Sequence, residues 1–143
     1  MEFDKDFLGK LFEQAVTNPR LRQNFDLRTS PADTSQRMLN ALLPGTKVPI
    51  HRHEDSTETV ICLVGKLEEI IYEEVNEYIY EATSCCGDVT RQRKIKEISR
   101  QILSPAEGKF GIQIPAGAWH TINVIEPSVI FEAKDGSYRR GDR

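Results

Sequence analysis

The sequence predicts an all-β protein, a barrel or jelly roll preceded by one α-helix. Two observations lead to this fold class. Beyond Pro19 the apolar residues fall into short runs separated by turn signals, and no helical segments alternate with these runs. Many short strands at close spacing favour a closed or two-layered β-structure over an α/β sheet. The length of 143 residues suits one compact domain, which we expect to span 1–143.

The helix is expected over 4–18. Its apolar residues recur at the spacing of one helical face, and Asn18-Pro19 ends the segment. Asp4 or Asp6 is the candidate N-cap. The apolar face consists of Phe7, Leu8, Leu11, Phe12, Ala15 and Val16.

The candidate strands are short runs between turn residues. Turn signals include Pro44-Gly45, Gly65, Asn76, Pro115-Ala116-Gly117 and Glu126-Pro127. The predicted strands are 37–43, 48–53, 58–64, 66–73, 77–83, 110–114, 120–125 and 129–134.

Residues 84–104 break this rhythm and are expected to form an insertion between barrel strands. The segment carries little apolar pattern and combines Cys85-Cys86 with a basic run. The basic run could contact an anionic ligand or partner, but nearby acidic side chains offer counter-charge and favour a solvated segment. The basic residues are Arg91, Arg93, Lys94, Lys96 and Arg100, and the acidic ones are Glu68, Glu69, Glu73, Glu74, Glu77 and Glu81.

The charge of the chain is nearly balanced, with 19 Lys and Arg against 22 Asp and Glu. This composition argues against a nucleic-acid partner or a membrane partner. No apolar run approaches the roughly 20 residues that span a bilayer, and the acidic N-terminus does not resemble a signal peptide. The three cysteines are not spaced like a disulfide framework. Together these features predict a soluble, cytoplasmic protein.

Four residues form a candidate metal site: His51, His53, Glu58 and His120. The two histidines 51 and 53 are two residues apart, so on a strand both imidazoles point to the same face. Glu58 begins the returning strand after a polar turn, which places its carboxylate opposite these imidazoles. His120 follows the Pro115-Ala116-Gly117 turn, so a distant strand supplies a third imidazole.

All three histidines of the chain lie in these two segments. A lone histidine on a strand is more often a packed or surface residue than a ligand, but this joint placement favours metal binding. Three imidazoles and one carboxylate suit Zn, Fe, Mn, Ni, Co or Cu, and suit Mg or Ca poorly. The expected cofactor is therefore one divalent transition metal.

The spacing of these residues resembles the two motifs of the cupin superfamily. Gly45, five residues, His51-Arg52-His53, four residues, Glu58, six residues and Gly65 match the first motif at every fixed position. Pro115, Gly117 and His120 fit the second motif, whose leading glycine is displaced (Gly108 or Gly111) and whose asparagine, Asn123, is one residue early. The resemblance implies a double-stranded β-helix (jelly-roll) barrel with the metal inside its mouth.

A narrower resemblance covers almost the whole chain. It is carried by PRLRQN (19–24), QR (36–37), HRH (51–53), IPAGAWH (114–120), IEP (125–127) and FEAKDGSY (131–138). These segments look like the WbuC-type cupin fold metalloproteins, which are often encoded among genes for bacterial O-antigen and other surface polysaccharides. That family has no defined activity, and the insertion at 84–104 is longer than is usual for it.

Glu132 and Lys134 are candidate catalytic residues. They share one face of the last predicted strand, whereas Phe131 and Ala133 take the other face. Such alternation also suits a solvated surface, but beside a metal the pair could act in acid/base chemistry or substrate binding. Cys62 shares the face of Glu58, and a small buried hydrophobe is its simplest interpretation.

Arg20, Arg22 and Arg37 are candidate substrate-binding residues. Arginine binds carboxylate and phosphate through two parallel hydrogen bonds, which suits a sugar phosphate, nucleotide sugar or sugar acid. Ion pairs with neighbouring acids are the alternative for each of the three. Trp119 could stack on a sugar ring, but strand alternation turns it away from the ion and favours packing.

These features favour a metal-dependent enzyme that acts on a small, carbohydrate-like and anionic substrate. The resemblance implies an isomerase or epimerase of surface-polysaccharide biosynthesis, in which Glu132 or a metal-bound hydroxide moves the proton. An Fe(II)-dependent oxygenase and a non-catalytic sugar-binding or sensing module are the alternatives. A homodimer is expected, since edge strands need covering, and the helix could cover one within its own chain or across the interface.

Overall fold

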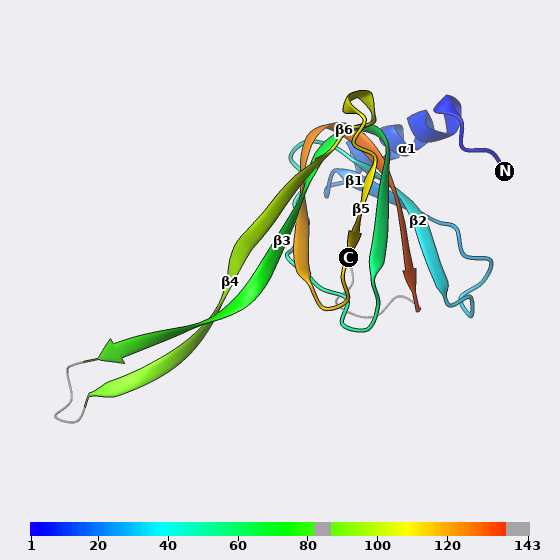
Figure 1. Cartoon of the computed structure of the whole chain (residues 1–143). Helices are drawn as coiled ribbons and strands as arrows, with labels where there is room; N and C mark the ends of the chain where they lie inside the picture. Colours follow the sequence, from blue (N-terminus) through cyan, green and yellow to red (C-terminus); the bar gives the residue numbers. More distant parts are fainter. Residues whose placement is uncertain (82–86, 137–143) are drawn as a thin grey trace.

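The computed structural model describes residues 1–81 and 87–136, in which one α-helix precedes antiparallel strands (Figure 1). The all-β fold with an N-terminal helix that the sequence predicts is confirmed. The elements are α1 (Lys5–Thr17), β1 (Arg22–Asp26), β2 (Ser35–Leu42), β3 (Glu58–Glu81), β4 (Asp88–Leu103), the short 3-10 helix η1 (Pro105–Glu107), β5 (Gly111–Ile114) and β6 (Trp119–Asp135).

Helix α1 forms where the sequence predicts it and covers one outer face of the sheet. Asp4 caps it by accepting a hydrogen bond of 2.9 Å from the backbone N–H of Phe7. Leu11 and Ala15 are buried in a cluster with Leu39, Ala41 and Val129 of β2 and β6. The helix therefore packs on strands of its own chain. Among the described residues, no helix is long and apolar enough to cross a bilayer.

The strands pair in the order β1-β2-β6-β3-β4, and β5 also pairs with β3. The long strands β3 and β6 pair twice, once before and once after a set of register shifts between Cys62 and Leu67. These shifts bend both strands and curl the sheet around an apolar interior, and we call this body the barrel. Its interior consists of Leu42, Val60, Cys62, Leu67, Leu103, Ile114, Ile122, Val124 and Ile130.

Gly65 lies at the bend of β3 and tolerates no side chain there. Its φ is +97°, and a Cβ atom would lie 2.2 Å from the carbonyl oxygen of Pro127 on β6. Lys66 donates its backbone N–H to the Ser128 hydroxyl at 3.0 Å, which holds the two bent strands together. The glycine at the end of the first motif is thus explained by the close approach of two backbones.

The prediction for 65–104 is corrected in two respects. Gly65 and Asn76 do not end strands, because β3 runs unbroken from Glu58 to Glu81. Asp88–Leu103, expected within an insertion, forms the regular strand β4 paired with β3. The sequence hid this strand because nearly all of its side chains are exposed, so no apolar alternation marks it. Cys85 and Cys86 lie outside the described residues.

Together β3 and β4 leave the barrel as a long two-stranded ribbon (Figure 1). We call its outer part, 72–81 and 88–97, the arm. Beyond Tyr72, which pairs with Trp119 of β6, no described strand other than β4 pairs with β3.

Candidate metal centre

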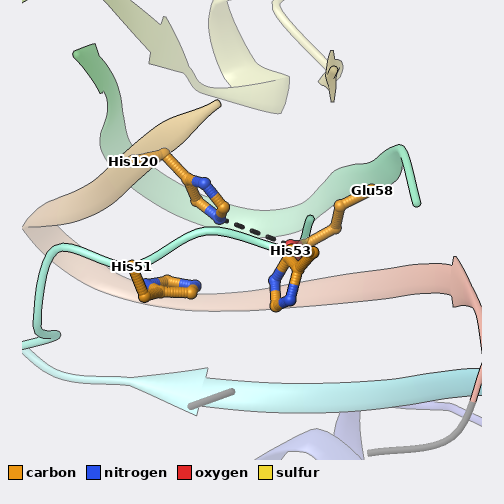
Figure 2. Close-up of side chains that lie close together, drawn as sticks. All are labelled: His51, His53, Glu58 and His120. Atoms are coloured by element: carbon orange, nitrogen blue, oxygen red, sulfur yellow. Dashed lines mark ion pairs between the residues drawn. The ribbon is translucent and has the colours of Figure 1, made fainter. Parts of the chain in front are cut away.

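Three imidazoles and one carboxylate lie close together in one cluster (Figure 2). One ligand atom from each of His51, His53, Glu58 and His120 lies within 4.8 Å of all the others. The four side chains are buried, with exposed fractions from 1% for His120 to 9% for His53. Glu58 Oε2 lies 2.7 Å from His53 Nε2 and 3.4 Å from His120 Nε2. The grouping that the sequence predicts is therefore present as a cluster that could hold a metal ion.

The segment that carries His51 and His53 is not the regular strand that the sequence predicts. Only His51 forms a β-bridge, to His120, through two backbone hydrogen bonds of 3.0 and 2.8 Å. The carbonyl of His53 accepts a bond of 2.7 Å from Gly117 N–H, and the Thr121 hydroxyl donates to Val48 O at 2.6 Å. The loop is thus fastened to the start of β6, which brings its two imidazoles beside the third.

Two of the imidazoles are oriented by backbone carbonyls. His51 Nδ1 lies 2.8 Å from Pro49 O, and His120 Nδ1 lies 2.9 Å from Ala118 O. A carbonyl only accepts hydrogen bonds, so Nδ1 carries the proton in both rings and Nε2 presents its lone pair to the cluster. His120 Nε2 is a buried nitrogen without a hydrogen bond. This is the arrangement that a neutral, metal-binding imidazole requires.

The donor set fits a transition metal. An ion with bonds of about 2.1 Å joins donor atoms that are at most about 4.2 Å apart, so the cluster closes around an ion with shifts of a few tenths of an ångström. Nitrogen-rich donor sets favour Zn, Fe, Mn, Co or Ni over Mg and Ca. The four residues would hold the ion, and their number leaves coordination positions for a substrate.

A small hollow of about 10 Å³ adjoins the cluster, and both predicted catalytic residues line it. Glu132 is 5% exposed and Lys134 is partly buried, and their strand neighbours on β3 are Val60 and Glu58. Gln36 and Met38 of β2 complete the wall beside them. The shared face of Glu132 and Lys134 therefore faces the interior next to the candidate metal ligands.

The three predicted arginines are not among the residues that line this hollow. Arg22 is buried and donates to Lys47 O at 2.9 Å and to the Thr46 hydroxyl at 3.3 Å, so it holds the start of the His51 loop. Arg37 pairs with Asp33 at 3.0 Å on the face of β2 opposite Gln36, and Arg20 is exposed. Substrate binding by these three residues stays a prediction.

Cys62 and Glu69 are further polar or titratable side chains of the interior. Burial raises the pKa of the Cys62 thiol to about 11, and Cys62 lies in the apolar interior, as expected for a small hydrophobe. Glu69 is fully buried and pairs with Ile122 on the inner face of β6. Its expected place among the surface counter-charges is therefore wrong, and its alternation with Leu67 is the signal that would have placed it inside.

Trp119 points away from the cluster, as the alternation of β6 predicts. Its indole N–H donates to Glu74 Oε1 at 3.0 Å, and the Arg52 guanidinium lies 4.6 Å from the ring centroid. The residue therefore packs at the base of the arm, outside the barrel.

Comparison with known families shows to which family the chain belongs. A family model described as a domain of unknown function (DUF6016) matches residues 3–83, more than half of the chain. The chain belongs to this family. No curated protein matches it in sequence.

Solved structures share the fold. KdgF from Halomonas sp. aligns with a TM-score of 0.54 at 15% identity over 85% of each chain. A cupin 2 domain-containing protein from Halorhodospira halophila gives a TM-score of 0.57 at 18% identity, over 85% of this chain and 69% of that one. Oxalate oxidase in complex with the substrate analogue glycolate gives 0.55 at 12% identity, over 84% and 53%. The fold is that of a cupin barrel with an N-terminal helix.

Proposed function

We propose that this protein is a metal-dependent cupin enzyme that isomerises or epimerises a small, carbohydrate-like and anionic substrate. The observation that carries the proposal is that the buried Glu132 and the partly buried Lys134 line the hollow beside the His51, His53, Glu58 and His120 cluster. A buried acid and a cation next to a metal-binding group are the groups that proton abstraction beside a carbonyl needs.

The chain's own residues have separate roles in this chemistry. A bound ion would supply Lewis-acid polarisation of a substrate oxygen. The Glu132 carboxylate would take a proton from the substrate carbon and return it on the other face or at the neighbouring carbon. Lys134 would hold an anionic group of the substrate through its ammonium. The hollow of about 10 Å³ admits little more than a water molecule, so the substrate must displace the Met38 or Gln36 side chain.

The biological setting rests on the resemblance to WbuC-type cupins. That resemblance supports a role in bacterial surface-polysaccharide biosynthesis, where sugar phosphates and nucleotide sugars are the anionic substrates. A cytoplasmic location and a substrate role for Arg20, Arg22 and Arg37 belong to the same proposal.

Solvent isotope exchange tests the reaction class. The metal-loaded protein is incubated in deuterated water with a panel of sugar phosphates and nucleotide sugars, and deuterium incorporation is measured by mass spectrometry. We expect incorporation into at least one compound. The Glu132→Gln variant should lose it, whereas Glu126→Gln, an exposed change on the same strand, should retain it.

The alternatives give different results in the same preparation. Oxygen consumption that depends on both iron and a substrate, without deuterium exchange, would show an oxygenase. Tight binding of a sugar without turnover, unchanged in Glu132→Gln, would show a binding module. An absence of deuterium from every compound in the panel would count against the isomerase.

A further inference from the structure

The arm presents two chemically different faces. Strand alternation and the pairing of β3 with β4 divide its side chains into two sets. We call them the charged face and the aromatic face. The charged face consists of Glu73, Val75, Glu77 and Ile79 with Thr90, Gln92, Lys94 and Lys96, and the aromatic face consists of Tyr72, Glu74, Asn76, Tyr78 and Tyr80 with Val89, Arg91, Arg93, Ile95 and Glu97.

The charged side chains on the charged face pair with one another. Glu73 lies opposite Lys96 in the β3–β4 register, and Lys94 forms an ion pair with Glu77. Acidic and basic side chains of this face lie next to each other, as they do on an ordinary solvated surface.

The aromatic face leaves large apolar side chains in water. Tyr78, Tyr80 and Val89 are 67%, 66% and 62% exposed, and Ile95 is 42% exposed. A two-stranded ribbon is marginally stable when nothing packs on it. A cluster of exposed aromatic and aliphatic side chains on such a ribbon marks a contact surface.

On the aromatic face, the acidic and basic side chains lie at different distances from the base of the arm. Glu74 and Glu97 lie near the base of the arm, whereas Arg91 and Arg93 lie further out. Two arms that stack antiparallel therefore bring the arginines of one copy over the acidic base of the other, and a two-fold axis makes this contact twice. A register centred near Val75 and Lys94 sets Arg91 against Glu97 of the second copy and Tyr78 against the Tyr72 of that copy.

Edge pairing of two arms is the competing arrangement, and the charges oppose it. The free edge of β4 is basic, with Arg91, Arg93, Lys94 and Lys96 in sequence, so two copies of β4 repel each other. Pairing of β4 with the acidic β3 of another copy is a head-to-tail contact, which gives a ring or an open filament and not a two-fold dimer. Stacking through the aromatic face closes as a dimer.

A groove at the base of the arm offers a place for the outer part of the second copy's arm, at Tyr78 and Tyr80. It has a volume of about 530 Å³ and includes Tyr72, Glu74 and Trp119 beside Arg52 and the 115–118 turn. Tyr72 to Tyr80 spans roughly 30 Å at the rise of a β-strand, so a stacked arm reaches from its own base to the partner's groove. The ribbon face alone covers less than the roughly 800 Å² per partner of a stable interface, and the groove adds to it.

We propose that the aromatic face of the arm binds a second copy of this chain, with two arms stacked antiparallel so that Tyr78 and Tyr80 of one copy lie against the groove at Trp119 of the other. The inference does not depend on the chemistry of the metal centre.

Sedimentation equilibrium of the full-length chain tests the surface. We expect a mass of twice the chain mass of 16.3 kDa. Tyr78→Ser, on the aromatic face, should raise the dimer dissociation constant at least about tenfold. Ile79→Ser, the adjacent residue on the charged face, should change it less than about twofold. Unchanged far-UV circular dichroism of both variants shows that the fold is intact.

A charge exchange tests the antiparallel arrangement. Arg91→Glu alone and Glu97→Arg alone should each weaken self-association, although Glu97 also pairs with Arg100 in its own chain. A mixture of the two variants should form a heterodimer, because both contacts then join opposite charges. Lys94→Glu, on the charged face, is the matched control and should dimerise like the unmodified chain.

A monomeric unmodified chain would overturn the proposal, as would a dimer that Tyr78→Ser and Ile79→Ser affect equally. A monomer whose aromatic face binds single-stranded nucleic acid or a polysaccharide would overturn it too. Failure of the two charge variants to associate when mixed would exclude the antiparallel stacking.

Discussion

The two halves of β3 have the same strand alternation and opposite surroundings. In the barrel half, Glu58, Val60 and Cys62 are 3%, 0% and 2% exposed, and β5 and β6 flank the strand. In the arm half, Tyr78 and Ile79 are 67% and 41% exposed although they point to opposite faces. The comparison shows that a period-2 pattern selects a strand, whereas burial depends on which segments pack against each face.

The barrel half of β3 is suited to chemistry, whereas the arm half is suited to association with another chain. The barrel half of β3 carries Glu58 and lies beside Glu132 of β6. Both carboxyl groups are buried, so they are held in a fixed environment with little water. The arm half carries exposed ion pairs, which contribute little stability because water screens them. We therefore expect the barrel to carry the metal and most of the stability of the fold, and substitutions in the arm to change the free energy of unfolding little.

The largest expected effect is loss of the metal. His51→Ala or His120→Ala removes one of the imidazoles that backbone carbonyls orient, so the purified protein should lose stoichiometric metal while its circular dichroism still shows a folded barrel. Elemental analysis gives the metal per chain. Ile79→Ser in the arm should keep a full equivalent, and the ligand assignment is wrong if both histidine variants keep one as well.

A pair of isoleucines measures the difference in packing. Ile130 is fully buried in the barrel, and Ile79 is 41% exposed on the arm. Ile130→Ala should lower the free energy of unfolding by about 2–5 kcal/mol, because it leaves a cavity in a packed interior. Ile79→Ala should change it by less than about 0.5 kcal/mol. Denaturation with urea gives both values, and equal losses would contradict the comparison.

Two glycines with positive φ test the close approach of β3 and β6 in the barrel. Gly108, at φ +75°, has no neighbouring atom within 4 Å of the place that a Cβ would take, so Gly108→Ala should cost about 1–2 kcal/mol for the left-handed backbone alone. Gly65→Ala adds a collision with Pro127 O and should cost more than that. If thermal unfolding shows the two variants to be equally stable, the close approach of β3 and β6 does not prevent a side chain from fitting at position 65.

The smallest expected effect depends on pH. Burial raises the pKa of the Cys62 thiol to about 11, above the roughly 8.5 of an unfolded chain. The folded state therefore holds this proton more tightly, so the contribution of Cys62 to stability is fully present below about pH 8.5 and declines as the pH rises toward 11. Cys62→Ala should accordingly cost less stability at about pH 10 than at neutral pH, measured by urea denaturation at each pH. An equal cost at both would show that the thiol is not shielded.

Much of the site was predictable because its residues carry local signals. The helix, the turn before His120 and the return at Glu58 are marked by caps and turn residues, and the structure has each of them. The loop from Val48 to His53 was predicted as a strand, but it is held to β6 by hydrogen bonds between distant segments. No local propensity encodes such bonds, so the sequence identified the residues of the cluster through an incorrect local conformation.

The sequence by itself determined the fold class, the N-terminal helix and the four residues of the candidate metal site, because motif spacing and strand alternation are properties of the chain. Only the tertiary structure decided that Glu69 is buried, that Arg22 supports a loop and that Asp88–Leu103 is a strand. The physical reason is that burial, side-chain partners and the pairing of an exposed strand depend on neighbours far away in the chain. A residue's own type and spacing do not specify those neighbours.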